Sequence, residues 1–141
     1  MLFVRALLVW LVMMGVEFCH GALRTLFLAP LLGDFRARQV SVLTGSVLIV
    51  FVAYVFIHWI RAESAASQLA VGVLWLLLTV AFEASLGHYI FQLSWEAVLE
   101  DFNLLQGRLM PLGLVVLTLS PWIATRFRDR AEAKRLPVDR R

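Results

Sequence analysis

The chain has 141 residues, of which 61% are hydrophobic and 16% are charged, and its mean hydropathy is +0.82. One soluble core of this length cannot bury that much apolar surface, so the composition excludes an ordinary soluble protein. The formal net charge is +3, with a cluster of basic residues near the carboxyl terminus. The sequence predicts an integral membrane protein that forms one all-α domain.

The first apolar segment, residues 6–16, falls short of the roughly 20 residues that a crossing needs, and it continues only through Glu17. Arg5 followed by an apolar run also resembles a secretory signal peptide. No pair of small residues follows the run to form a cleavage site, and the residues before Cys19 are not those of a lipoprotein signal. We therefore expect a retained transmembrane helix with Glu17 at membrane depth.

The second segment, residues 40–60, is the clearest span, because no formal charge interrupts it before Arg61. The third segment, residues 69–82, is again too short for a full crossing and continues through Glu83. A second acidic side chain is therefore expected within a transmembrane helix.

The fourth segment, residues 109–125, has Pro111 in its first turn, where a missing amide costs little. Pro121 is expected to kink its far end. The sequence thus predicts a four-helix transmembrane bundle over residues 1–125, followed by a basic tail over residues 126–141.

Basic residues predict the orientation, because they are retained on the cytoplasmic side during insertion. Those beyond the fourth span are Arg126, Arg128, Arg130, Lys134, Arg135, Arg140 and Arg141. The loop between the first two spans offers only Arg24, Arg36 and Arg38. Both termini should be cytoplasmic. The tail has no aromatic residues for base stacking and adjoins a span, so membrane lipids are expected partners and nucleic acid is not.

Residues 93–105, between the third and fourth spans, place apolar and acidic side chains on different sides of a helix. Ser94 is its expected N-cap. With both termini inside, this segment faces outward. We interpret it as a short helix in the outer membrane interface or as one that only packs the loop against the bundle.

The two halves of the chain share an order of residues that suggests a parallel two-helix repeat. A Glu-x-x-x-Gly, Asp-Phe, Gly order occurs twice, as Glu17, Gly21, Asp34-Phe35 and Gly45, and as Glu83, Gly87, Asp101-Phe102 and Gly113. Each copy begins on an outward helix and ends on a returning one.

An ionised carboxylate at membrane depth has a desolvation cost on the order of several kcal/mol unless it is paired, hydrated or protonated. Glu17, His20 and Arg24 recur at helical spacing and form one polar stripe. The predicted outward-side ligand site comprises Glu17, His20, Arg24, Glu83, Asp101 and Arg108. The alternative is a structural ion-pair network in which Arg24, Arg38 or Arg108 only holds the bundle together.

Metal and catalytic signatures are weak. Glu17 and His20 have the spacing used in di-metal helix bundles, and Glu83 and His88 would complete a four-ligand set, but only one Glu-x-x-His pair is present. A single cysteine, Cys19, excludes an intramolecular disulfide or a Cys-x-x-Cys pair. No nucleophile elbow, phosphate loop or His-Glu-x-x-His occurs. The sequence assigns no metal, names no cofactor and does not support an enzyme.

Several runs resemble a group of small four-span bacterial inner-membrane proteins of uncharacterised activity. They are Leu74-Trp75 to Phe82-Glu83, Leu86-Gly87, Ser94-Trp95, Asp101 to Asn103 and Leu109 to Gly113. The resemblance implies a bacterial inner-membrane setting and adds no catalytic or binding assignment.

The sequence therefore favours a small ligand-binding or transport-accessory membrane protein whose polar site takes a small or amphipathic ligand. Two alternatives stay open. One is a structural or assembly subunit, with a homo-oligomer or a membrane complex as its partner, and the other is a membrane metalloenzyme.

Overall fold

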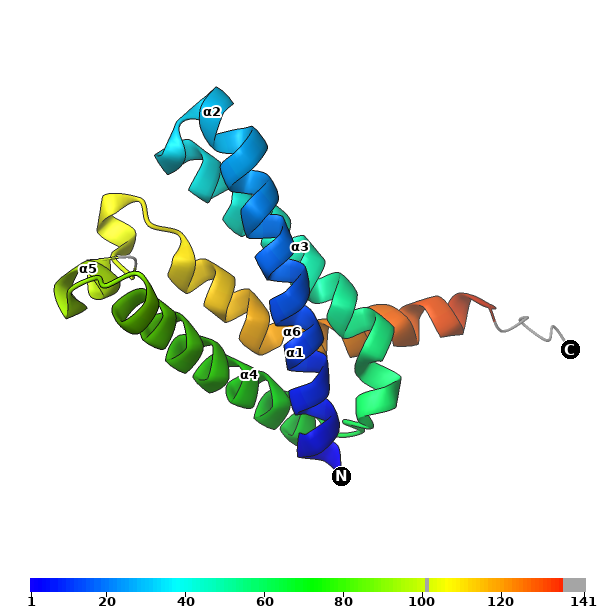
Figure 1. The fold of residues 1–141 in the computed structure, drawn as a ribbon. Helices are drawn as coiled ribbons and strands as arrows, with labels where there is room; N and C mark the ends of the chain where they lie inside the picture. Colours follow the sequence, from blue (N-terminus) through cyan, green and yellow to red (C-terminus); the bar gives the residue numbers. More distant parts are fainter. Residues whose placement is uncertain (101, 136–141) are drawn as a thin grey trace, which may run out of the picture.

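The computed structural model describes residues 1–100 and 102–135, and all regular secondary structure in these residues is helical (Figure 1). Four helices in them are long and apolar enough to cross a membrane, namely Leu2–Leu32, Asp34–Ile60, Ala65–Ile90 and Met110–Lys134. The predicted all-α four-helix bundle is confirmed, and the chain is a multi-pass membrane protein.

The first crossing is a continuous helix made of α1 (Leu2–Leu23), a π-helical turn η1 (Arg24–Leu28) and α2 (Ala29–Leu32). At 1.5 Å per residue it is about 46 Å long, which exceeds the roughly 30 Å of hydrocarbon in a bilayer. The helix stops at Gly33, whose φ of 80° suits a residue without a side chain. Glu17 therefore lies well inside a helix, as predicted.

The second crossing, α3 (Asp34–Ile60), begins six residues earlier than the predicted span. It stops at Arg61, which adopts the left-handed conformation typical of a helix C-terminus. After a short turn, Ser64 caps α4 (Ala65–Ser85) through a reciprocal capping box with Ser67. This short connection reverses the direction of the chain between α3 and α4.

The third crossing also ends in a π-helical turn, η2 (Leu86–Ile90). The next helix, α5 (Trp95–Glu100), is shorter than the predicted segment, and a single 3-10 turn, η3 (Leu104–Gln106), follows it. The hydroxyl of Ser94 accepts a hydrogen bond from the amide of Ala97 at 3.2 Å, which confirms the predicted cap.

The last helix, α6 (Met110–Arg135), has Pro111 in its first turn, as predicted. It does not stop near Thr125 but continues through residues 126–135. The helix therefore continues across the predicted boundary between the bundle and the basic tail. Residues 136–141 lie outside the described residues.

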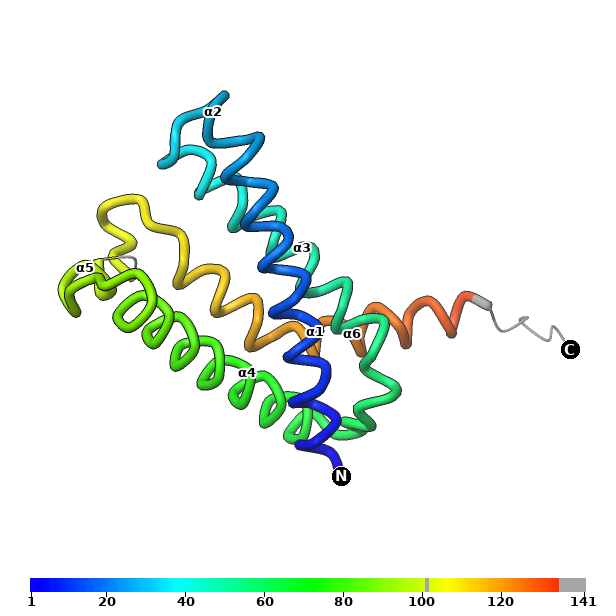
Figure 2. The backbone as a smooth tube through the Cα atoms, viewed as in Figure 1, coloured from blue at the N-terminus to red at the C-terminus, as the bar shows by residue number. Residues whose placement is uncertain are grey.

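Proline inside α6 removes one helical hydrogen bond, and the neighbouring serine compensates for it. Pro121 has no amide to donate to the carbonyl of Leu117, but the Ser120 hydroxyl donates to that oxygen at 2.7 Å. Both Ser120 and Pro121 are fully buried. The orange part of α6 changes direction in Figure 2, as expected of a proline kink.

The helices form two antiparallel pairs, α1 with α3 and α4 with α6, and α3 packs on α6 between them. We call the end that holds Met1 and the α3–α4 turn the terminal end, and the end that carries α2 and α5 the loop end (Figure 1). Most of the buried core lies toward the terminal end: Ala6, Val9, Trp10, Met13, Val52, Ala53, Ile57, Ile60, Ala62, Val71, Trp75, Leu117 and Ala124.

Helix contacts in this core are unusually close. A Cβ atom at Gly72 of α4 would lie 1.8 Å from the carbonyl oxygen of Thr118 in α6, so these backbones touch. Between α1 and α4, the Trp75 indole donates to the Ala6 carbonyl at 2.8 Å, and the indole of α1 Trp10 donates to a threonine hydroxyl of α4 at 3.0 Å.

Two glycines of the predicted repeat, Gly45 and Gly113, have different neighbours. A Cβ at Gly45 would meet the carboxylate of Glu17, whereas a Cβ at Gly113 would meet Val42 of α3. The equivalence of Glu17 with Glu83 therefore stays a prediction.

Candidate functional site

Glu17 points from α1 toward α3. A Cβ at Gly45 would lie 2.9 Å from its Oε2 atom, so the missing side chain of this glycine makes room for the carboxylate. The Glu17 side chain is 27% exposed, and its buried Oε1 atom has no hydrogen-bond partner in the part of the chain that the structure describes. The Glu17 carboxylate therefore faces α3.

His20 joins Glu17 to α3. Its Nδ1 atom lies 3.3 Å from Oε2 of Glu17, and its Nε2 atom lies 2.8 Å from the Thr44 hydroxyl. The Thr44 hydroxyl also lies 3.1 Å from the carbonyl oxygen of Val40. These four groups form one continuous hydrogen-bonded chain between two transmembrane helices.

Two proton arrangements fit these distances. With Glu17 ionised and a proton on Nδ1, His20 donates to Glu17 and accepts from Thr44. With one more proton, carried by Glu17, the carboxylic acid donates to Nδ1, and Nε2 donates to Thr44, whose own hydroxyl donates to Val40. The chain ends at a backbone carbonyl, which accepts a hydrogen bond but does not pass a proton on, so we assign no proton relay to it.

The order carboxylate, imidazole, hydroxyl is also that of hydrolase triads. Acyl transfer additionally needs backbone amides that are free to hold an oxyanion. Thr44 lies in the middle of α3, where the amides bond to carbonyls one turn earlier, so this requirement is not met. We assign no nucleophilic role to Thr44.

Two further polar atoms are buried without a hydrogen-bond partner among the described residues, the Nε atom of Arg24 and the hydroxyl of Ser41. The contacts of Glu17 with Gly45 and of His20 with Thr44 fix an antiparallel register between α1 and α3. This register places Arg24 beside the turn of α3 that contains Ser41. Because buried polar groups are nearly always bonded, each of these atoms is free to bond to water or to a ligand.

Arg24 begins the π-helical turn η1. Such turns are rare in proteins and recur at functional sites, because the extra residue reorients the side chains around it. No pattern in the amino-acid sequence announces it. The turn adds a backbone feature to the polar stripe that the sequence predicted.

Asp34, at the start of α3, interacts with arginines of the loop end. It accepts a hydrogen bond from Arg38 at 2.8 Å, and the charges of Arg24 and Arg108 also act on it. The structure thus associates Arg24 and Arg108 with an aspartate that the sequence reasoning placed only in the repeat. Arg38 bonds to this aspartate, and the partner of Glu17 is His20 instead.

The second acid lies on another helix. Glu83 is half-buried near the end of α4, two turns beyond Trp75. His88 stacks on Trp95 with ring centres 4.2 Å apart, and its Nδ1 atom lies 3.0 Å from the carbonyl oxygen of Leu93. Asp101 lies outside the described residues.

The four-ligand metal arrangement considered from the sequence is not assembled in the described residues. No three His, Cys, Asp or Glu side chains gather there closely enough to hold a metal ion. His88 is engaged with α5 instead of lying beside His20. The metalloenzyme interpretation gains no structural support.

Sequence reasoning missed the α3 side of the site, which is Ser41, Thr44 and Gly45. These small and polar residues recur at three- and four-residue spacing in an otherwise apolar span. That spacing is typical of a helix–helix contact in a membrane, so the signal was present. It would have identified α3 as the partner of the Glu17 stripe.

No known protein family matches this chain, and no curated protein or solved structure is significantly similar to it.

Proposed function

We propose that the contact between α1 and α3 binds a small or amphipathic ligand, so that the protein acts as a ligand-binding or transport-accessory membrane protein. The observation that carries the proposal is the set of three buried, unbonded polar atoms, on Glu17, Arg24 and Ser41. A suitable ligand offers a hydrogen-bond donor to the carboxylate and an acceptor to the guanidinium, with an apolar remainder in the bilayer.

A bacterial inner membrane is the setting we propose, with both termini in the cytoplasm. The support is the concentration of basic residues beyond the fourth span. Met1 and the turn between α3 and α4 also lie together at one end of the bundle (Figure 1). The ligand site would then open toward the outer leaflet.

The orientation is testable with reporters in a bacterial host. A reporter that works only in the cytoplasm should be active when it is fused after Arg141. A reporter that works only in the periplasm should be active when it is inserted near Glu100. The opposite pattern would reverse the side of the ligand site.

Replacing Glu17 by glutamine should leave the folded protein intact but weaken ligand binding, because it removes a charge and not a packing group. The probes are palmitate, lysophosphatidylethanolamine and a short-chain ubiquinone, each added to purified protein in a neutral detergent. A binder at about 100 times its dissociation constant stabilises the parent by about 2.7 kcal/mol. We expect Glu17→Gln to lose most of that stabilisation in thermal melts.

Two further variants separate site chemistry from global effects. Gly45→Ala keeps the charge but pushes the Glu17 carboxylate out of its niche, so it should weaken the same probe. Glu96→Gln changes an exposed acid of α5 and should leave binding unchanged. Two outcomes would contradict the proposal: no probe stabilises the parent, or Glu17→Gln lowers the unfolding temperature while each probe stabilises it as much as the parent. In either case Glu17 has a structural role, and the assembly-subunit interpretation is favoured.

A further inference from the structure

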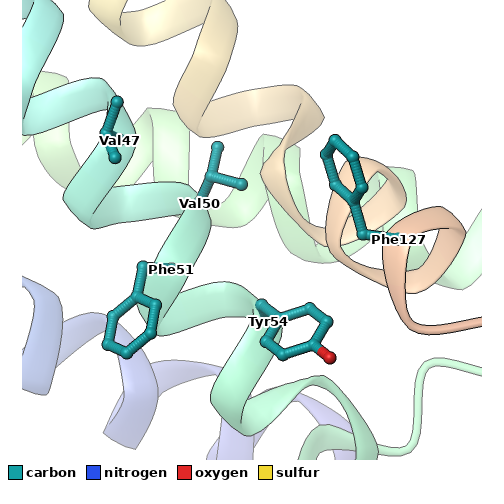
Figure 3. Close-up of a pocket in the computed structure, with 5 residues that line it drawn as sticks. All are labelled: Val47, Val50, Phe51, Tyr54 and Phe127. Carbon is teal, nitrogen blue, oxygen red and sulfur yellow. The ribbon is translucent and has the colours of Figure 1, made fainter. Parts of the chain in front are cut away.

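The terminal part of α6 leaves the four-helix core after the Pro121 kink, passes α3 and projects away from the other helices (Figures 1 and 2). A groove of about 420 Å³ lies between these two helices. Its lining residues are Val47, Val50, Phe51 and Tyr54 of α3 and Phe127 of α6. Figure 3 shows Val50 and Tyr54 on one side of this groove and Phe127 on the other.

Polar contacts hold the two walls of the groove in place. Arg128 donates to the carbonyl oxygen of Tyr54 at 3.0 Å, and its guanidinium lies 5.5 Å from the centre of the Tyr54 ring. Glu132 lies 3.7 Å from Arg128 and 3.6 Å from His58 of α3. The groove is therefore formed by a fixed helix pair and does not depend on a flexible loop.

A second hollow, of about 430 Å³, lies on the other side of Phe127 and is basic. It is lined by Trp122, Ile123, Phe127, Arg126 and Arg130. Arg126 lies 5.1 Å from the centre of the Trp122 ring. The ion pairs among the described residues include neither Arg126 nor Arg130. Two arginines one helical turn apart thus stand beside the end of the apolar groove.

Two exposed tryptophans lie on the same two helices. Trp59, near the end of α3, is 46% exposed, and Trp122, directly after the Pro121 kink of α6, is 42% exposed. Exposed tryptophans are typical of the boundary between hydrocarbon and headgroups. The apolar groove is lined by residues of two membrane crossings, and Arg126 and Arg130 flank Phe127 on α6.

We propose that this surface is a binding site for one anionic phospholipid at the terminal end of the bundle. Arg126 and Arg130 hold the phosphate, and one acyl chain lies in the groove between α3 and Phe127. Charge complementarity selects the occupant: guanidinium groups bind phosphate through paired hydrogen bonds, and an anionic headgroup avoids bringing a further cation among the arginines. The site is independent of the α1–α3 ligand site.

The test uses the full chain purified in a neutral detergent. Short-chain phosphatidylglycerol should raise the thermal unfolding temperature and saturate at one lipid per protein in native mass spectrometry, whereas phosphatidylcholine of the same chain length should bind about tenfold more weakly. The Arg126→Gln, Arg130→Gln double variant should lose most of this preference, because it removes the charged donors to the phosphate.

The matched control is the Arg36→Gln, Arg61→Gln double variant, which has the same change in net charge at exposed positions elsewhere. It should keep the preference for phosphatidylglycerol. An equal loss in both double variants would show general attraction to a basic protein and would overturn the site.

The acyl-chain part of the proposal has its own test. Val47→Trp fills the groove from an exposed position and leaves the arginines unchanged. It should therefore weaken the binding of intact phosphatidylglycerol about tenfold. Glycerol phosphate alone should not stabilise the parent. If glycerol phosphate reproduces the effect of the lipid, or if Val47→Trp binds the lipid as the parent does, the surface recognises phosphate only.

Discussion

Replacing Gly72 by alanine is expected to lower the free energy of unfolding by about 3 kcal/mol or more, the largest effect expected at any glycine of the described residues. A Cβ atom there would lie 1.8 Å from the carbonyl oxygen of Thr118 and 2.8 Å from its carbonyl carbon. These are backbone atoms of α6, which cannot rotate away as the end of a flexible side chain can. The two helices would have to separate along their whole contact.

Unfolding of purified protein by a denaturing detergent, followed by circular dichroism, measures this effect. Gly15→Ala is the matched control, because nothing lies within 4 Å of a Cβ at that position of α1. Alanine is the better helix former by about 1 kcal/mol, so the control should be neutral or slightly stabilising. Equal stability of the two variants would mean that α4 and α6 do not meet at Gly72.

Replacing Trp75 by alanine is expected to cost about 3–5 kcal/mol, since the side chain is wholly buried and its removal leaves a large cavity. Its indole also donates to the carbonyl of Ala6, which ties α4 to α1. Trp75→Phe keeps much of the volume and removes the donor, so it should cost less. The same unfolding measurement separates packing from hydrogen bonding.

The control for Trp75 is Trp59→Ala, which truncates a tryptophan that is 46% exposed near the end of α3. We expect a loss of about 1 kcal/mol or less for that variant, because little core packing is removed. A comparable loss for both tryptophans would contradict the placement of the core at the terminal end of the bundle.

The sequence by itself determined the four crossings, because a bilayer leaves no other place for so many long apolar segments. It also determined local features that depend on near neighbours in the chain. The Ser94 cap and the position of Pro111 in a first turn were both predicted correctly. The stripe of Glu17 and His20 follows from helical spacing alone. Each of these needs only one helix to be known.

Helix ends were predicted less well. α6 continues through the arginines that the sequence assigned to a tail, because arginine is a good helix former and a fall in hydropathy does not stop a helix. The π-helical turn at Arg24 was not predictable, because it arises from how the backbone packs and not from a pattern of residue types.

Only the tertiary structure decided which groups each polar side chain meets. Spacing along α1 could not show that Glu17 occupies the space above Gly45, or that His20 reaches Thr44, because both contacts depend on the register between two helices. The groove beside Phe127 likewise exists because α6 bends and α3 continues past it. The apolar pattern favours insertion of each helix into the membrane, where lipid solvates every apolar face equally well. The choice of partner face then depends on close packing and hydrogen bonds between helices, and these appear only when the helices are assembled.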